Sequence, residues 1–479
     1  MTKNSKVIGV LILILVAASF LRLYSLNSYP PGLYSDEAMN GNNAAEALES
    51  DDFKIFYTEN NGREGLFMNI QALFLRFSGV NEPWVLRLPS TLFGILTVLG
   101  VYLLTKELFG RNDVALLAAF LIATSFWHIN FSRIGFRAIM APAFLTWGLY
   151  LLLCSFRNSK LEIRNWPLPA LAGLVYGLGM HSYIAYRATP LFIAFSLWLL
   201  AFRHGSKQTL KIGAIFTAAA VIVFLPLGFY FLENPADFFG RTSQISVWQS
   251  SAPFKDLGLN ILKTAGMFNI AGDWNPRHNI PGAPLLWLPV GILFLVGLAI
   301  SIKQIKSLPS KIILGWIIVA ALPVVVSNEG MPHALRAIIM APAVFILAAL
   351  GGVWFYDRVK TVSRAKFINI ISFIVIAFIA ANAYTSYFLD WTKRPEVADA
   401  FNQKYVRIAE ELNALPPELP KYVVLATGGH DVREIGTPAQ TIMYLTDTFL
   451  PEKQKEKNLF YISPTEAQSV PQNSVIFNL

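Results

Sequence analysis

The sequence has few charged residues and almost no cysteine. Charged residues make up 14% of the 479 residues and hydrophobic residues 54%, whereas soluble domains carry about a quarter charged residues. The single cysteine, Cys154, lies inside an apolar run and excludes an internal disulfide and a cysteine-rich metal site. The sequence also lacks a phosphate-cradling glycine loop and a nucleophile elbow. This composition indicates a polytopic membrane protein.

The net charge of +9 does not indicate nucleic-acid binding. The excess cations lie in short loops between apolar runs, which is how membrane topology is encoded. A membrane-spanning helix needs about 20 mostly apolar residues. The first apolar run lacks a small-residue cleavage site, so we expect a retained helix rather than a signal peptide. We expect about eleven spans, near residues 7–24, 84–105, 114–131, 138–156, 167–183, 188–203, 212–232, 284–302, 311–327, 335–356 and 367–389.

The distribution of cations predicts the orientation. A cytoplasmic amino terminus puts seventeen lysines and arginines in cytoplasmic segments and leaves four arginines in the short outer loops. The first loop (25–83), a long loop (233–283) and the carboxyl-terminal tail then lie outside the cytoplasm. We therefore expect a multi-pass protein of the cell (plasma) membrane.

The tail differs in composition from the rest of the chain. "KYVVLAT", "NLFYIS" and "NSVIFNL" have the pattern of short strands, and residues 396–414 and 437–447 have the pattern of helices. We expect residues 1–390 to form the membrane domain and residues 391–479 a small extracytoplasmic α/β domain.

An acidic pair, Asp36 and Glu37, follows the first apolar run in "SDEAMNGNNAAEAL". One interpretation is structural: Ser35 caps a helix, and acids are favoured in its first turn by the helix dipole. The other is catalytic, because helical spacing places Asp36, Asn40 and Asn43 on one polar side. The pair could also hold a divalent metal, although no cofactor is required by the sequence.

Four arginines remain on the cation-poor side: Arg133, Arg137, Arg187 and Arg336. Each could extend its head group to lipid phosphates. Guanidinium groups also bind phosphate through paired planar hydrogen bonds, as a lipid-linked phosphate at the outer leaflet would require. Two of these arginines begin similar segments, "RAIMAPAF" (137–144) and "RAIIMAPAV" (336–344), which indicates one local device used twice.

Two other polar segments join predicted spans. "HSYIAYR" (181–187) contains His181, which has the pattern of a structural histidine, and Tyr183, which has the pattern of an interfacial aromatic residue. "NIAGDWNPRHNIPGAP" (269–284) contains Asp273 and His278. Turn chemistry explains its Gly, Pro and Asn content, and the Asp/His spacing does not match a zinc signature.

Several of these stretches resemble one known family. The apolar run followed by "YSDEA" and "NEPWVLRLPSTLFGILTVLGVYLLTKELFG" resembles the protein O-mannosyltransferase-like (family 39) glycosyltransferases of the GT-C fold. "MHSYIAYRATPL", "GDWNPRHNIPGAP" and "MPHALRAIIMAPAVFILAALG", with His333, resemble bacterial members. The resemblance covers residues 1–360 approximately. Many relatives have a "PPL" segment where this chain has "GREGLFMN" (62–69), in which Glu64 would take the place of a second acid.

The resemblance implies an integral-membrane glycosyltransferase that uses a polyprenyl-phosphate sugar. It implies that Asp36 is the base, with Glu37 beside it, and that the acceptor is a protein, lipid or glycan. It makes Arg133, Arg137, Arg187, Arg336, Glu64, His181, Tyr183, Asp273, His278 and His333 candidates for substrate binding. A sugar-phosphate donor needs a cation to steady its leaving phosphate and one carboxylate to deprotonate the acceptor. Direct displacement would invert the anomeric centre.

Two other classes of protein remain open. A transporter or lipid flippase would also have many spans, but transporters place ionisable residues near the middle of the membrane. The predicted spans are nearly free of such residues at their centres. A non-catalytic scaffold that binds a partner through its tail would not depend on Asp36.

Overall fold

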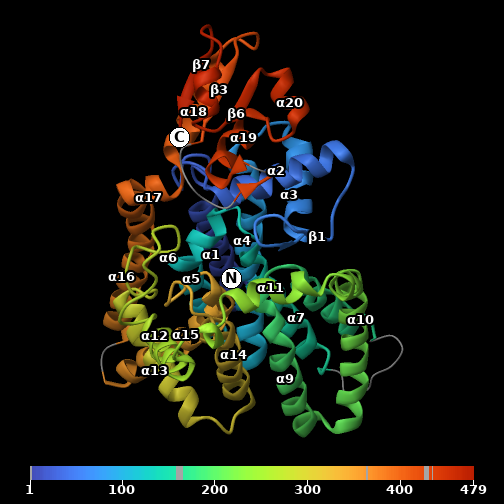
Figure 1. Ribbon diagram of the computed structural model, residues 1–479. Coiled ribbons are helices and arrows are strands. Elements are labelled where there is room, and N and C mark those ends of the chain that lie inside the picture. Colours follow the sequence, from blue (N-terminus) through green and yellow to red (C-terminus); the bar gives the residue numbers. More distant parts are fainter. Residues whose placement is uncertain (1–2, 158–165, 363–364, 426–430, 434) are drawn as a thin grey trace. The chain divides into compact units, whose positions relative to one another are not determined.

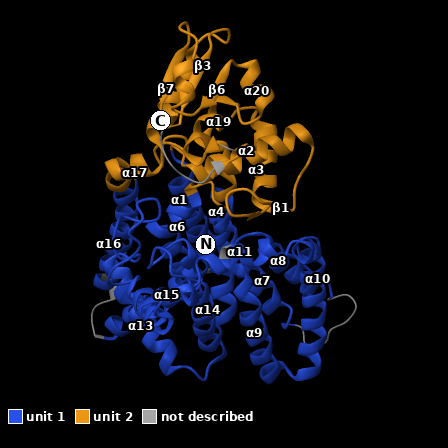
Figure 2. Ribbon diagram, viewed as in Figure 1, with its two compact units in different colours: residues 1–24, 91–132, 137–387 blue, residues 25–90, 133–136, 388–479 orange. Residues whose placement is uncertain are grey.

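The computed structural model describes residues 3–157, 166–362, 365–425, 431–433 and 435–479 and is mostly helical. The chain divides into two compact units (Figures 1 and 2). Unit 1 contains residues 1–24, 91–132 and 137–387, and unit 2 contains residues 25–90, 133–136 and 388–479.

Each of the predicted apolar runs forms helix. The helices are α1 (Lys3–Leu23), α4 (Pro83–Phe109), α5 (Asn112–Ala123), α6 (Phe126–Arg133), α7 (Met140–Cys154), α8 (Pro167–Leu178), α9 (Thr189–His204), α10 (Ser206–Glu233), α13 (Leu288–Lys303), α14 (Leu308–Val325), α15 (Ala341–Val362) and α16 (Ala365–Tyr384). Between α10 and α13 lie α11 (Pro235–Gln244) and α12 (Pro253–Gly266).

Within the described residues, eight helical segments are long and apolar enough to span a membrane, and α5 with α6 would make a ninth. That number is lower than the predicted eleven, because α13 has 16 residues and α8 has 12, whereas a span needs about 20. The apolar helices nevertheless confirm a multi-pass membrane protein.

The α5–α6 pair bends by 57°. The break exposes the last carbonyl groups of α5, and buried Arg22 of α1 satisfies them. Its Nη1 donates to the Ala123 carbonyl oxygen at 3.0 Å and its Nη2 to that of Ile122 at 3.3 Å. Helix breaks inside a membrane protein need such partners because free backbone groups are costly there.

Helix α15 is the most buried candidate span of unit 1, with 78% of its apolar window inside the structure. It packs closely on α13 through two glycines. A Cβ atom on Gly297 would lie 1.8 Å from the carbonyl oxygen of Leu347, and one on Gly351 would lie 2.0 Å from that of Leu293. Small residues permit this approach of two apolar helices.

Unit 2 contains a parallel sheet of three strands in the order β6-β3-β7, with bounds Leu459–Ile462, Lys421–Val424 and Val475–Asn478. These strands fall in the three predicted stretches. The predicted helical stretches contain α17 (Pro395–Ala400), α18 (Gln403–Ala414) and α19 (Gln440–Thr446). Unit 2 also includes α2 (Ser35–Ser50), β1 (Phe56–Tyr57), β2 (Arg63–Glu64), α3 (Leu66–Ser78), β4 (Asp431–Val432), β5 (Ile435–Gly436) and α20 (Pro451–Glu456).

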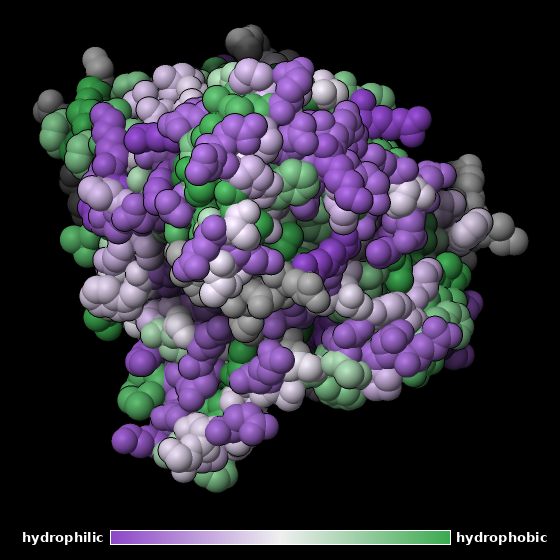
Figure 3. Space-filling view, turned by 45° about the horizontal axis from the view of Figure 1, so that its top comes forward, coloured by the Kyte–Doolittle hydropathy of each residue, from purple (hydrophilic) through white to green (hydrophobic). Residues whose placement is uncertain are grey.

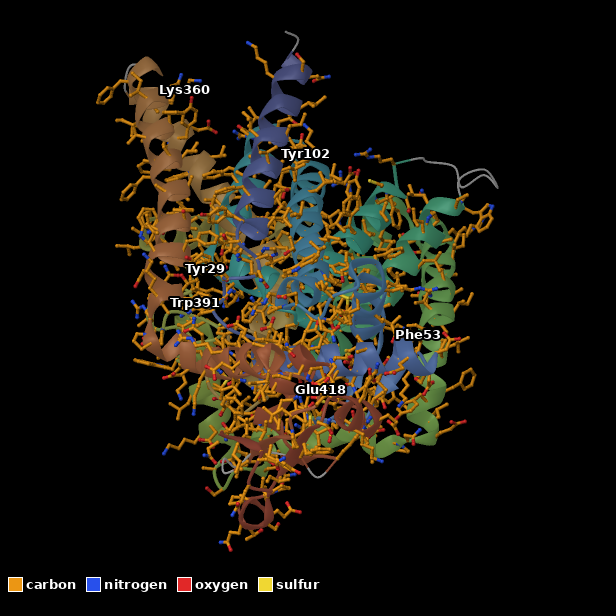
Figure 4. All side chains as sticks on the ribbon, turned by 90° about the horizontal axis from the view of Figure 1, so that it is seen from above. Tyr29, Phe53, Tyr102, Lys360, Trp391 and Glu418 are labelled. Carbon is orange, nitrogen blue, oxygen red and sulfur yellow. The ribbon has the colours of Figure 1, made fainter. Side chains whose placement is uncertain are left out.

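The second unit is larger than the predicted tail domain, because the first loop shares its core. Tyr444 of α19 packs with Ala44 of α2 and Leu86 of α4. Polar contacts reinforce this packing: Asn42 donates to the Gln440 side chain at 2.9 Å. Nearby, Tyr29 packs edge-on against Phe388 (Figure 4 labels Tyr29). Residues 25–90 and 388–479 therefore fold as one body.

Hydrophilic side chains cover most of the face drawn in Figure 3. The described spans instead expose many apolar side chains. In the candidate span Phe367–Lys393, which begins in α16, only 17% of the most apolar window is buried in the structure. In the candidate span Asn4–Leu23 of α1, only 22% is buried. Such exposure fits helices whose outer faces contact lipid.

Candidate active site

The two acids of the predicted pair lie in the first turn of α2 but have different surroundings. Glu37 is completely buried, whereas Asp36 is partly exposed. Because one residue of helix turns the side chain by about 100°, neighbours on a helix point to different faces. The pair is therefore not one bidentate group.

Glu37 forms a buried ion pair with Arg87 of α4, with 3.0 Å between Oε1 and Nε. The backbone N–H of Gly135 also donates to Glu37 Oε1 at 2.7 Å. Arg87 also binds backbone: its Nη1 donates to the carbonyl oxygens of Leu26 and Pro30, and its Nη2 donates to that of Gly32 and, at 3.4 Å, to Glu37 Oε2. Arg87 thus fixes both the loop before α2 and the helix itself.

The Asp36 carboxylate accepts one hydrogen bond on each oxygen. The Tyr34 hydroxyl donates to Oδ2, and Asn60 Nδ2 donates to Oδ1 at 2.8 Å. Asn60 is held by a turn in which it, Asn61 and Gly62 all have positive φ, a conformation that asparagine and glycine adopt most readily. A carboxylate can accept further bonds, so Asp36 can still accept a hydrogen bond from a ligand.

The polar side of α2 continues toward a short hairpin. Arg63 of β2 is buried and donates to the side-chain oxygens of Asn40 and Asn43, at 2.6 and 2.8 Å. This confirms that these asparagines share one side of the helix. Glu64, the predicted second acid, follows Arg63 and is 2% exposed. In the facing strand, burial raises the pKa of Tyr57 to about 12, so its hydroxyl is protonated at neutral pH.

Arg133 belongs to unit 2 and holds its first loop. Its Nη2 donates to the carbonyl oxygens of Ser25 and Tyr29, at 3.3 and 2.8 Å. Its guanidinium also lies 4.9 Å from the centre of the Phe388 ring. These contacts lie inside the protein and indicate a structural role for Arg133.

The two similar arginine segments have the same local structure in unit 1. Arg137 begins a 3₁₀ turn, η1 (Arg137–Ile139), that leads into α7, and Arg336 begins η6 (Arg336–Met340), which leads into α15. The two turns contact each other. Arg137 lies over the Tyr183 ring, 5.7 Å from its centre. Arg336 forms an ion pair with Glu329 at 2.6 Å.

The other candidates of "HSYIAYR" have identifiable partners. Arg187 lies over the Phe231 and Phe238 rings, and its Nη1 donates to the Phe238 carbonyl oxygen at 2.8 Å. His181 Nε2 lies 2.9 Å from the carbonyl oxygen of Val223. These contacts agree with a structural task for both residues.

Asp273, His278 and His333 form a cluster in unit 1. One candidate ligand atom of each lies within 4.8 Å of those of the other two. Asp273 Oδ2 is 2.9 Å from His278 Nδ1 and accepts the backbone N–H of Ala334 at 2.8 Å. Trp127 holds this loop by donating to the Ala334 carbonyl oxygen at 3.0 Å. Among the residues that the structure describes, only this cluster brings three or more His, Cys, Asp or Glu side chains close enough to hold one metal ion.

Comparisons with known proteins concern the fold of the chain. Residues 66–230 match the model of the dolichyl-phosphate-mannose-protein mannosyltransferase family. The structure of ArnT from Cupriavidus metallidurans bound to undecaprenyl phosphate superposes with a TM-score of 0.59 at 15% identity, covering 98% of this chain and 90% of that chain. The chain has the GT-C fold. This confirms the fold that the resemblance implied.

Two relatives are similar in sequence to part of the chain. Dolichyl-phosphooligosaccharide-protein glycotransferase 3 of Archaeoglobus fulgidus is 29% identical over 172 residues, which is 33% of this chain and 20% of that protein. The putative mannosyltransferase YkcB of Bacillus subtilis is 28% identical over 229 residues, 46% of this chain and 30% of that protein. The aligned part of this chain therefore spans less than a third of each of these relatives.

Sequence reasoning missed three residues that shape the acidic site of this GT-C chain: Tyr34, Asn60 and Arg87. Arg87 is the arginine of the "RLPS" stretch, which carried the family resemblance without a role for any one residue. Asn60 stands in "ENNGR", whose asparagine and glycine content predicts a tight turn. Neither signal indicates which side chain the turn brings to Asp36.

Proposed function

We propose that the protein is an integral-membrane glycosyltransferase that moves a sugar from a polyprenyl-phosphate carrier to an acceptor hydroxyl. The proposal depends mainly on Asp36: a partly exposed carboxylate, held by Tyr34 and Asn60, beside a rigid buried ion pair. The family match, the GT-C fold and the undecaprenyl phosphate bound by ArnT support it.

In the proposed reaction, Asp36 accepts the proton of the acceptor hydroxyl as its oxygen attacks the anomeric carbon. The bond between that carbon and the phosphate oxygen breaks, and the carrier phosphate leaves with the electron pair. Because phosphate is a weak base, no general acid is needed. One displacement inverts the anomeric centre, as in single-displacement glycosidases.

We propose Arg137 as the residue that binds the carrier phosphate. Arg137 begins η1, the turn that leads into α7. Stacking of Arg137 over Tyr183 fixes the plane of its guanidinium, and the N–H groups of a stacked guanidinium point outward in that plane. Such a group can bind phosphate with two parallel bonds.

We propose the cluster Asp273–His278–His333 as a divalent metal site. Two imidazoles and one carboxylate suit a transition metal such as Zn²⁺ and leave open coordination positions. A metal there would supply positive charge for phosphate. Because Asp273 Oδ2 also accepts the Ala334 N–H, its orientation is set by the protein, as metal-binding carboxylates generally require.

The orientation of the chain is also a proposal, supported by the cation asymmetry: a cytoplasmic amino terminus and external acidic segments. A reporter that is active only in the cytoplasm, fused after Leu479, should be silent. Activity of this reporter would contradict the proposed orientation.

The experiment that tests the function incubates the purified full-length protein with a panel of polyprenyl-phosphate sugars and a mixture of acceptors. Release of polyprenyl phosphate that requires acceptor is the expected result. Movement of the intact lipid-linked sugar across a vesicle bilayer, without release of polyprenyl phosphate, would instead identify a flippase.

A further inference from the structure

Unit 1 contains a polar cleft that the proposed function does not use. Its volume is about 360 Å³, within the range of sites for small molecules. It lies where the segment after α11 meets the loop after α14. It is lined by Gln244, Ile245, Ser246, Gln249, Ser250, Asn328 and Glu329.

The walls of the cleft are held by backbone pairing. The N–H of Val247 donates to the Val326 carbonyl oxygen, and the N–H of Asn328 to that of Ile245, both at 2.8 Å. Asn260 of α12 is 3% exposed and donates to the carbonyl oxygen of Ser327 at 3.0 Å. A buried amide that binds the underside of a loop fixes its shape.

The polar groups at the rim are also oriented. Asp256 of α12 accepts hydrogen bonds from the Ser250 hydroxyl and, at 3.2 Å, from Asn328 Nδ2. The hydrogen bond from Ser250 has the larger effect and that from Asn328 the smaller. Both lower the pKa of Asp256, so its carboxylate is ionised at neutral pH. Arg336 binds Glu329 from the buried side: its Nη1 donates to the Glu329 carbonyl oxygen at 2.7 Å and its Nη2 to Oε2 at 2.6 Å.

The lining determines which ligand fits. Amide and hydroxyl side chains both donate and accept hydrogen bonds, which matches the alternating donors and acceptors of a polyhydroxylated ring. None of the described residues that line the cleft is a cation, and Glu329 is an acid. An anionic ligand such as phosphate would therefore meet a carboxylate and no cation among these lining residues, which disfavours its binding.

From these observations we infer that the cleft binds an uncharged saccharide, the acceptor glycan, and that Arg336 is a positioning residue for Glu329. The identification of this saccharide as the acceptor rests on the proposed glycosyl transfer, whereas saccharide binding by the cleft does not. The donor sugar is a poorer occupant, because its phosphate would have to lie beside a cleft that offers no cation of its own.

The test measures binding of neutral disaccharides to the purified full-length protein by saturation-transfer NMR and calorimetry. Glucose 1-phosphate and glucuronate are the anionic probes. Wild-type protein should bind at least one neutral disaccharide and neither anion. Gln249→Ala and Asn328→Ala should each weaken binding about 3- to 10-fold, the loss of one or two hydrogen bonds. Gln304→Ala, an exposed glutamine far along the chain from the lining residues, should bind like wild type.

The outcomes separate this inference from the proposed function. Disaccharide binding that is unchanged by both cleft variants, or preference for an anionic probe, would overturn the inference. Turnover of polyprenyl-phosphate sugar without any disaccharide binding would overturn it while the proposed function stands. Disaccharide binding that is lost in Gln249→Ala, with no release of polyprenyl phosphate under any condition, would support the cleft and contradict the proposed function.

Discussion

Glu37 and Arg87 form an ion pair 3.0 Å long in which neither side chain is exposed. Each side chain also binds backbone groups, so the pair joins α2, α4, the loop before α2 and Gly135. This relationship explains why adjacent acids have different tasks. Glu37 is buried and supports the helix, whereas Asp36, one residue earlier, is partly exposed, as the proposed base must be.

The first prediction concerns that ion pair. Glu37→Gln should destabilise unit 2 by about 3–5 kcal/mol, because Arg87 would keep a buried charge without its partner. Thermal unfolding in detergent would show the loss. The double variant Glu37→Met/Arg87→Leu removes both charges and should be less destabilised than Glu37→Gln. Equal stability of wild type and Glu37→Gln would show that the pair has no structural task.

The second prediction concerns Asp36. Asp36→Asn keeps the shape of the side chain but removes the proton acceptor, so turnover should fall about 10²–10⁴-fold with unchanged donor affinity. Asp51→Asn, at the other end of α2, is the matched control and should remain active. If Asp36→Asn retained normal turnover, Asp36 would be only a helix-starting residue.

Much of the fold could be predicted from sequence because hydrophobic length and alternation are local properties. The apolar runs became helices, and "KYVVLAT", "NLFYIS" and "NSVIFNL" contain the three strands of the sheet. The lengths of α8 and α13 could not be predicted, since proline positions and the turns around them decide where helix ends. For the same reason, eight or nine helical segments of the described residues meet the length criterion for a span, whereas the sequence predicts eleven.

The candidate site was predicted only in part. Asp36 stood out because an acid gains nothing from lipid. The partners Asn60 and Arg87 did not, because they reach α2 through long-range contacts that no sequence spacing encodes. The first loop joins the tail through further long-range contacts, among them Tyr444 against α2 and Asn42 with Gln440. The metal candidate was assigned to Asp36 and Glu37 by adjacency in sequence, whereas Asp273 and His333 are 60 residues apart and meet in space.

The third prediction concerns the union of α2 and α19. A Cβ atom on Gly41 would lie 2.6 Å from both Leu86 Cδ1 and Tyr444 Cε2. Gly41→Val should therefore push α19 from α2, cost about 1–3 kcal/mol and lower turnover. Gly258→Val in α12 is the control, because a Cβ atom on this helical glycine meets nothing within 4 Å, and turnover should change less there.

Removal of residues 391–479 should also lower turnover. The membrane helices should still insert, but α2 would lose Tyr444 and Gln440, and activity should be lost. Full activity after truncation would show that the tail does not support the acidic site. Protease protection of the membrane-embedded helices distinguishes loss of activity from failure to insert.

The fourth prediction separates two arginines. Arg137→Lys keeps the charge but loses the planar fork, so donor affinity should fall about 10-fold or more with little change in thermal stability. Arg133→Lys should mainly lower thermal stability, because it loses hydrogen bonds to the Ser25 and Tyr29 carbonyl oxygens. Normal donor affinity in Arg137→Lys would remove Arg137 from the phosphate site.

The last prediction concerns metal. Purified wild-type protein dialysed against Zn²⁺ should retain about one ion per chain, and Asp273→Asn and His333→Gln should each lower the affinity about 10–100-fold, the usual effect of disturbing a metal site. Elemental analysis and thermal shift measure this without turnover. His204→Gln, a histidine outside the cluster, should bind metal like wild type. Because metal ligands must be deprotonated to coordinate, metal binding should weaken in acid. If the wild type binds no divalent ion and Asp273→Asn still unfolds at a lower temperature, then Asp273 and His278 form a hydrogen-bonded pair that supports the loop of Ala334, and the metal assignment is wrong.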